Sequence, residues 1–211
     1  LYNPLDICRW NLNKGYLRDL QSKGVLIVPT YWLERLNPQS IESVFQASLA
    51  KRLVAKPLVG ANADDTFVLH LEDVESWNDA VGVFGGREVM VQPFVDSIQV
   101  EGEYSLFYFG GRFSHSIVKL PAEGDFRVQE EHGGIIRSVA PAEDLVRAGK
   151  QAIKAIEKTL LYARVDLVRL DSGQPALIEM ELIEPSLYFD QCPESAEMFA
   201  AQFDRLVGLL K

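Results

Sequence analysis

The tightest constraint on the fold comes from two strand-like segments near the C-terminus, 164–170 and 175–182, which only four residues separate. The intervening residues, 171–174, read Asp-Ser-Gly-Gln, a composition typical of turns. A connection this short joins antiparallel neighbours, so the sequence predicts a β-hairpin. With a four-residue loop, Val168 faces Leu177, and the other facing pairs follow from that register.

Three acidic side chains fall on one face of this hairpin. Asp166 faces Glu179 across the two strands, and Glu181 lies two residues further along, on the same face. Like charges in direct opposition destabilise a sheet, so the arrangement favours a bound cation, and oxygen ligands suit Mg²⁺ better than Zn²⁺. Two other interpretations remain open: Arg164 faces Glu181 and could form an ordinary ion pair with it, or the acids are solvated at a sheet edge.

Composition limits the classes of partner. A formal net charge of -9 and a pI near 4.9 argue against a nucleic acid or an acidic membrane, since binding to phosphate groups needs a surplus of lysine and arginine. Cys8 and Cys192 are far apart and fit neither a disulfide framework nor a thiolate zinc site. No apolar run approaches the roughly 20 residues that span a bilayer. We therefore expect a cytoplasmic protein with small-molecule substrates.

The remaining pattern predicts an α+β fold in two parts that meet near Pro93-Phe94, with domains at 1–92 and 93–211. Helices are expected in the first part at 11–23, 40–50 and 72–81, and strands at 25–28, 52–56, 66–71 and 88–92. In the second part a hairpin at 103–109 and 112–119 precedes a long amphipathic helix at 141–161, the acidic hairpin, and a final helix at about 193–210.

Lysine and arginine side chains beside loops are candidates for phosphate contacts. Lys56 ends a strand and precedes a loop of small residues, 57–66, where backbone N–H groups could surround phosphate oxygens. The glycine spacings of a Walker loop or a dinucleotide fingerprint are missing, so a hairpin connection with a solvated lysine remains open. Lys119 and Arg127 lie near the irregular stretch 130–134 and could balance triphosphate charge. No histidine is assigned a catalytic role.

Several short motifs occur in a characteristic order: Asn13-Lys14, Val54-Ala55-Lys56-Pro57, Val89-Met90-Val91-Gln92-Pro93-Phe94, Gly102-Glu103-Tyr104-Ser105, Ala163-Arg164-Val165-Asp166, Ile178-Glu179-Met180-Glu181 and Glu184-Pro185-Ser186. In this order the chain resembles the ATP-grasp superfamily, in particular the branch of amide-forming ligases that is similar to bacterial glutathione synthetase. The resemblance extends over nearly the whole chain.

The resemblance implies an ATP-grasp fold, with a nucleotide held between two α+β subdomains that have antiparallel sheets. It implies Mg²⁺, or Mn²⁺, on Asp166, Glu179 and Glu181. It implies nucleotide contacts from Lys14, Lys56, Gln92, Pro93, Phe94 and Glu103. Arg127 and Lys119 match catalytic residues that contact the phosphoryl group, and the substrate would lie toward Glu184, Ser186, Gly133 and Gly134.

The expected activity is that of an ATP- and Mg²⁺-dependent ligase, which joins a small carboxylate to an amine or another nucleophile through an acyl phosphate. A nucleotide-binding protein without catalysis and a kinase that stops after phosphoryl transfer are the alternatives. The chain departs from many relatives in having Glu181 where they have asparagine, and in fewer glycines at 60–63. The family's N-terminal domain is not expected within these residues, and a homo-oligomer is compatible with the sequence.

Overall fold

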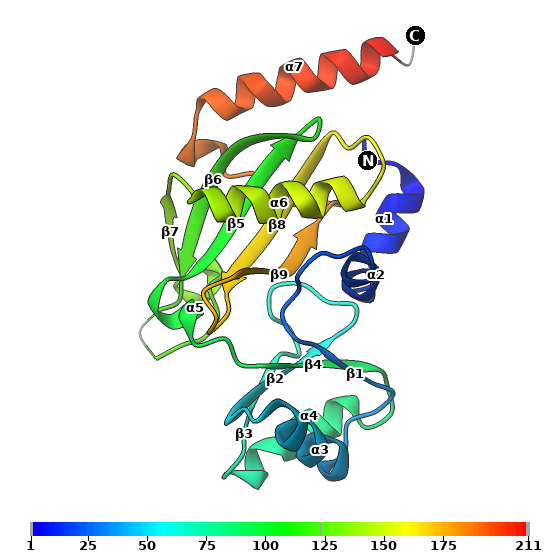
Figure 1. Ribbon diagram of the computed structural model, residues 1–211, viewed down its shortest axis with the longest axis vertical. Helices are drawn as coiled ribbons and strands as arrows, with labels where there is room; N and C mark the ends of the chain where they lie inside the picture. The colour runs from blue at the N-terminus through cyan, green and yellow to red at the C-terminus, as the bar shows by residue number, and fades with distance from the viewer. Residues whose placement is uncertain (1, 123, 210–211) are drawn as a thin grey trace. The chain divides into compact units, whose positions relative to one another are not determined.

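The computed structural model of the protein describes residues 2–122 and 124–209. The chain divides into two compact units, each built on an antiparallel sheet (Figure 1). Unit 1 comprises Leu1–Ile27 together with Ser97–Lys211, and unit 2 comprises Val28–Asp96. These bounds differ from the division at residues 92 and 93 expected from sequence. The leading segment, residues 2–27, packs against the sheet of unit 1.

Unit 2 is a four-stranded sheet with two helices on one face. The strand order is β1 (Tyr31–Leu33), β4 (Val89–Pro93), β2 (Arg52–Pro57) and β3 (Phe67–His70). The helices are α3 (Pro38–Ser48) and α4 (Trp77–Phe84), the latter preceded by the 3₁₀ turn η1 (Val74–Ser76). Their apolar faces and the inner face of the sheet form one core that includes Phe45, Leu53, Trp77 and Phe84. Asn37 caps α3 with a capping box, which fixes where that helix begins.

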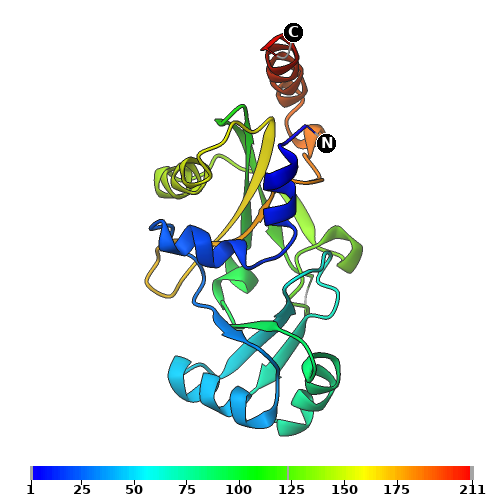
Figure 2. The same ribbon diagram turned by 90° about the vertical axis from the view of Figure 1, so that its right-hand side faces the viewer.

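Unit 1 is built on a five-stranded sheet with the order β7 (Ile135–Ser138), β6 (Arg112–Leu120), β5 (Glu103–Phe109), β8 (Tyr162–Arg169) and β9 (Pro175–Glu181). Its helices are α1 (Leu5–Asn11), α2 (Tyr16–Ser22), α5 (Ser97–Val100), α6 (Glu143–Ala155) and α7 (Glu194–Leu209), with 3₁₀ turns η2 (Glu130–His132) and η3 (Phe189–Gln191). Helix α6 lies across one face of the sheet, and α1 and α2 lie beside the edge strand β9 (Figures 1 and 2).

The first predicted hairpin of unit 1 is confirmed. Its two-residue loop is Gly110-Gly111, and both glycines have positive φ, 56° and 76°. Such a loop needs the left-handed conformation at both positions, which glycine adopts without steric cost. The paired strands β5 and β6 supply Glu103 and Lys119 to the site described below.

The second predicted hairpin has the expected register at the acids. Asp166 faces Glu179, and Arg164 faces Glu181, as the sequence predicts. Both pairs lie on the part of the hairpin away from the loop. Strand pairing at these positions therefore brings the acids together.

Nearer the loop, the predicted register is wrong by one residue. Val168 faces Ala176 rather than Leu177, because the connection 170–174 is one residue longer than predicted. An irregularity in the ladder, between the pair at Asp166 and the pair at Leu167, inserts one extra residue into β9. The longer loop and the bulge offset each other, so the register is again the predicted one at the acids.

Other departures from the sequence-based assignment are local. Of the predicted helix 11–23, residues 16–22 form α2, while residue 11 ends α1, which was not expected from sequence. The predicted strand 25–28 contributes a single parallel bridge from Ile27 to Leu177. Helix α6 ends at Ala155 rather than at 161, and Glu157 takes the left-handed conformation just after it. Strands β1 and β7 were not predicted. Residue 210 of the predicted final helix lies outside the described residues.

Candidate functional site

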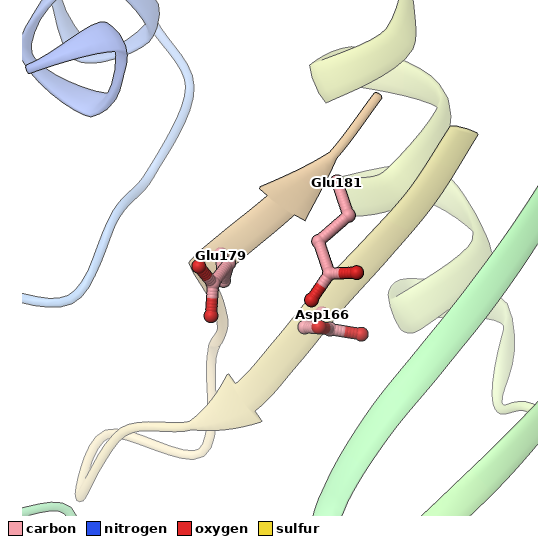
Figure 3. A group of neighbouring side chains, drawn as sticks. All are labelled: Asp166, Glu179 and Glu181. Carbon is pink, nitrogen blue, oxygen red and sulfur yellow. The ribbon is translucent and has the colours of Figure 1, made fainter. Parts of the chain in front are cut away.

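The three acids predicted as metal ligands lie together on one face of the hairpin. Asp166 is on β8, and Glu179 and Glu181 are on β9. One carboxylate oxygen of each residue lies within 4.8 Å of those of the other two. Figure 3 shows the three side chains on one side of the strand pair, with the carboxyl group of Glu181 directed toward Asp166. The predicted grouping is confirmed, while metal binding itself remains a prediction.

Asp166 is the most buried of the three acids, with 1% of its surface exposed. Its carboxylate accepts a 2.5 Å hydrogen bond from Ser105 Oγ and bonds of 3.0 to 3.1 Å from Nε and a terminal nitrogen of Arg164. Burial opposes ionisation, but Arg164 and Lys119 outweigh it and hold the pKa of Asp166 below its usual value. Asp166 is therefore ionised, which is the form that a metal ion needs.

Lys119 joins Asp166 to a fourth acid. Its ammonium group forms an ion pair with Glu103 and lies 3.6 Å from Asp166 Oδ2. Burial alone would lower the pKa of Lys119, yet the charges of Asp166 and Glu103 raise it above its usual value. Burial raises the pKa of Glu103, against the opposing effect of Lys119. The lysine thus stays charged in a buried position, held between two carboxyl groups.

The two acids on β9 also have basic partners. Lys14 Nζ lies 2.6 Å from Glu179 Oε1, and Arg164 forms an ion pair with Glu181. The ion pair considered from sequence is therefore present. It does not exclude a cation, because each carboxylate has further lone pairs to offer. Burial raises the pKa of Glu181 to about 7, although Arg164 opposes the shift.

The donor set fits a hard divalent cation. All three groups offer oxygen, which Mg²⁺ and Mn²⁺ prefer and which zinc sites seldom use alone. Around Mg²⁺ with bonds of about 2.1 Å, adjacent ligands lie about 3.0 Å apart and opposite ligands about 4.2 Å apart. The carboxylate oxygens lie within 4.8 Å of one another, so rotations of the glutamate side chains can bring them to these separations. Among the described residues of this cluster, four carboxylates face three basic side chains, Lys14, Lys119 and Arg164. Acidic side chains therefore outnumber basic ones in this cluster.

The predicted nucleotide-contacting residues of unit 2 lie on the antiparallel neighbours β2 and β4 and just after β4, with Lys56 toward one end of the strand pair and Pro93 toward the other. Lys56 is the second-last residue of β2, and Pro93 is the last residue of β4. Gln92 is 1% exposed, and its side-chain amide donates a 2.9 Å hydrogen bond to Thr30 Oγ1. The Arg52 guanidinium lies 3.8 Å from the centre of the Phe94 ring, a cation–π contact that orients the ring.

Arg127 is held within its own loop. Its guanidinium forms a bidentate ion pair with Asp125, with N–O distances of 2.7 to 3.2 Å. Asp125 also accepts hydrogen bonds from the main-chain N–H groups of Phe126 and Arg127. These bonds from Arg127 hold the pKa of Asp125 far below its usual value. Within the described residues, the ion pair of Arg127 therefore joins it to Asp125 and not to the acid cluster.

The predicted substrate residues lie in two loops. Gly133 has φ 81°, and a Cβ on Gly134 would come within 2.1 Å of the carbonyl oxygen of Val128, so both glycines have a structural reason to be there. Glu184 and Ser186 follow β9 and are exposed. A surface depression of about 740 Å³ lies along α6 instead, and none of its lining residues is a predicted site residue.

Sequence reasoning did not assign Arg164 and Ser105 to the site. Arg164 donates hydrogen bonds to Asp166 and Glu181, and Ser105 donates one to Asp166 Oδ1. Arg164 could have been found from its position two residues before Asp166, which places both side chains on the same face of β8. Ser105 could not, because its pairing with Asp166 depends on the order of strands in the sheet.

Comparison with solved structures identifies the fold. The ATP-grasp ligase PsnB, complexed with a minimal precursor, Mg and ADP, matches with a TM-score of 0.68 at 13% identity, over 95% of this chain and 61% of that one. D-alanine–D-alanine ligase from Bacillus anthracis matches with a TM-score of 0.66 at 18% identity, over 94% and 66%. At these identities the likeness shows the fold alone, which is the predicted ATP-grasp fold.

A more similar relative decides the family. The cycloserine biosynthesis protein DcsG of Streptomyces lavendulae is 33% identical over 216 aligned positions, which cover 95% of this chain and 71% of that protein. The crystal structure of D-cycloserine synthetase DcsG matches with a TM-score of 0.83 at 29% identity, over 98% of this chain and 74% of that one. The chain belongs to the ATP-grasp ligase family. It is an ATP-dependent ligase, as the sequence predicts.

No protein-family model matches the chain. Within the part of the chain that the structure describes, no helix combines the length and the apolar composition that crossing a membrane requires.

Proposed function

We propose that this ATP-grasp ligase joins a small carboxylic acid to an amine through an acyl phosphate. A carboxylate oxygen of the substrate attacks the γ-phosphorus of ATP, and the bond to ADP breaks. The amine then attacks the activated carbonyl carbon, inorganic phosphate leaves, and the amine gives up a proton. The observation that carries the proposal is the cluster of Asp166, Glu179 and Glu181, whose oxygens lie within 4.8 Å of one another in a chain of this family.

ATP and Mg²⁺ are the cofactors of this activity. Asp166, Glu179 and Glu181 would hold Mg²⁺, which when bound neutralises phosphate charge. Lys119 and Arg164 keep Asp166 ionised and in a fixed orientation, so the protein's own charges prepare the cluster before any ligand arrives. The prearranged charges support a catalytic role for Lys119.

We assign the nucleotide and the substrate to the remaining predicted residues. Lys14 and Lys56 bind phosphates. Glu103 contributes to nucleotide binding through its ion pair with Lys119. The adenine is contacted by Gln92, Pro93 and Phe94. Arg127 contacts the transferred phosphoryl group after leaving Asp125. Gly133, Gly134, Glu184 and Ser186 lie on the substrate side. Support for these roles comes from the family membership and from the order of the motifs along the chain.

The class of substrate follows from the same relatives. DcsG is a D-cycloserine synthetase, and the Bacillus anthracis enzyme joins two D-alanines. We propose amino-acid-sized carboxylates and amines for this chain. A net charge of -9 is compatible with such small substrates and supports the expectation of no nucleic-acid partner.

Trapping with hydroxylamine tests the proposal. The protein is incubated with ATP, Mg²⁺ and a panel of amino-acid-sized carboxylates, and both ADP and acyl hydroxamate are measured. We expect the two products in equal amounts with one class of acid, and neither product when the acid is omitted. ATP binding without ADP would favour a non-catalytic protein. ADP with a stable phosphorylated product that hydroxylamine does not intercept would favour a kinase.

A further inference from the structure

The outer edge of β9 is closed by the leading segment of the chain. β9 is the last strand of its sheet, so the main-chain groups on its outer side are not paired by another strand of that sheet. Residues between 11 and 26 hydrogen-bond these groups instead. The strand that they close carries both Glu179 and Glu181.

Asn11 makes two of these contacts. Its side-chain Nδ2 donates a 2.8 Å hydrogen bond to the carbonyl oxygen of Met180, and its Oδ1 accepts a 2.9 Å bond from the main-chain N–H of Leu182. The side chain is buried, with 8% of the residue exposed. An amide carries the same donor and acceptor as a peptide unit, so Asn11 takes the place of a neighbouring strand at this point.

Tyr16 and Leu26 complete the edge. The Tyr16 hydroxyl accepts a 2.7 Å hydrogen bond from the main-chain N–H of Met180, and Tyr16 is 3% exposed. Burial and the charge of Glu179 raise the pKa of Tyr16, so the phenol keeps its proton. The carbonyl oxygen of Leu26 accepts a 2.9 Å bond from the N–H of Leu177.

Met180 is the residue between the two acids of β9, and its main-chain bonds go to the leading segment. Val165 of β8 lies opposite it in the sheet, while its main-chain N–H and carbonyl oxygen are bonded on the outer side by Tyr16 and Asn11. The bulge in β9 lies just before Glu179, where the ladder with β8 is interrupted and holds the strand less firmly. The outer contacts therefore act where the inner ladder is weakest.

We propose that Asn11 and Tyr16 are positioning residues of the metal site, which fix the main chain at Met180 and thereby the carboxylates of Glu179 and Glu181. This inference rests on the proposed function. Metal sites need ligand positions held within about 0.5 Å, and a side chain moves with the backbone that bears it. The competing explanation is that these contacts only protect a sheet edge, in which case they would stabilise the fold without affecting metal affinity.

Direct metal binding separates the two explanations. Mn²⁺ is titrated in the presence of ADP and followed by electron paramagnetic resonance, for the unaltered protein and for Tyr16→Phe and Asn11→Ala. Each variant removes hydrogen bonds to Met180 while leaving all three acids in place. We expect the dissociation constant for Mn²⁺ to rise about 10-fold in each. We also expect excess Mg²⁺ to restore much of the rate of ADP formation.

Ser116→Ala is the matched control for stability. Ser116 Oγ donates a 2.7 Å hydrogen bond to the carbonyl oxygen of Val139, and Ser116 is 2% exposed, so this variant also loses a buried contact between a side chain and the main chain of the same unit. Its melting temperature should fall, while its Mn²⁺ affinity should match that of the unaltered protein.

Two results would overturn the inference. If Tyr16→Phe and Asn11→Ala are folded and bind Mn²⁺ as tightly as Ser116→Ala does, the contacts protect the edge and nothing more. If Asp166→Asn, measured in the same titration, also binds Mn²⁺ as tightly, the acids are not the metal site. The second result would also contradict the proposed function. The first result, with weak Mn²⁺ binding by Asp166→Asn, would contradict the inference alone.

Discussion

Replacing Asp166 with asparagine is expected to lower the rate of ADP formation by at least about 10³-fold, a loss of about 4 kcal/mol of transition-state stabilisation. The substitution keeps the size of the side chain but removes the charge that Arg164 and Lys119 hold in place. The fold should persist, because Arg164 keeps its pair with Glu181 and Lys119 keeps its pair with Glu103. Coupled measurement of ADP, together with thermal unfolding, checks both parts of this expectation.

Asp144→Asn is the matched control for Asp166→Asn. Asp144 also forms a bidentate ion pair with an arginine of unit 1, Arg169, at 2.7 and 3.1 Å. It lies at the start of α6 and has no proposed part in the reaction. The rate of ADP formation by Asp144→Asn should stay within about twofold of that of the unaltered protein. Normal turnover in Asp166→Asn would show that the acid cluster is not the metal site of the ligase.

Replacing Lys119 with methionine is expected to cost about 3–5 kcal/mol of the free energy of unfolding, because it leaves two buried carboxyl groups without their shared cation. The side chains of Lys119 and Glu103 are 6% and 12% exposed, and Asp166 is 1% exposed, so water cannot replace the lost partner. Urea denaturation measures the change. ADP formation should fall as well, since Lys119 helps to keep Asp166 ionised.

The double variant Lys119→Met/Glu103→Gln separates stability from activity. Removing the second charge of the buried pair should recover most of the lost free energy of unfolding, since the remaining groups are no longer an uncompensated pair of carboxyls. The rate of ADP formation should remain low. A loss of less than about 1 kcal/mol in the single variant would mean that water or a protonated Glu103 already compensates the buried charge.

Strand alternation together with the predicted hairpin register placed the acid cluster correctly from sequence. Asp166, Glu179 and Glu181 come together because side chains two residues apart share a face and because hairpin strands pair in register. The prediction held at the acids although the loop is longer than expected, since the bulge in β9 compensates for the additional loop residue. Without that bulge, Asp166 would face Ile178 instead, and the acids would lie on opposite faces.

The pairing of Glu103 with Lys119 shows the limit of the same reasoning. A hairpin closed by Gly110-Gly111 alone would place Glu103 opposite Val118. The irregularity between Leu106 and Tyr108 shifts the register by one residue, so that Glu103 faces Lys119. Nothing in the local sequence marks this shift, which arises where the strands pack against their neighbours.

Contacts between distant parts of the chain could not be predicted at all. Lys14 reaches Glu179, 165 residues away, and Asn11 and Tyr16 reach Met180 across similar separations. Helical and strand periodicity report only which face of an element is buried, not which element covers it. The leading segment was therefore assigned to the first domain on sequence grounds, although its hydrogen bonds go to β9.

A crystal structure of the protein with Mn²⁺ and a non-hydrolysable ATP analogue tests the central claim most directly. We predict anomalous density for Mn²⁺ about 2.1 Å from carboxylate oxygens of Asp166, Glu179 or Glu181 and beside the phosphates of the analogue. Mn²⁺ bound elsewhere, with the three carboxyl groups still paired only to Lys14, Lys119 and Arg164, would contradict it.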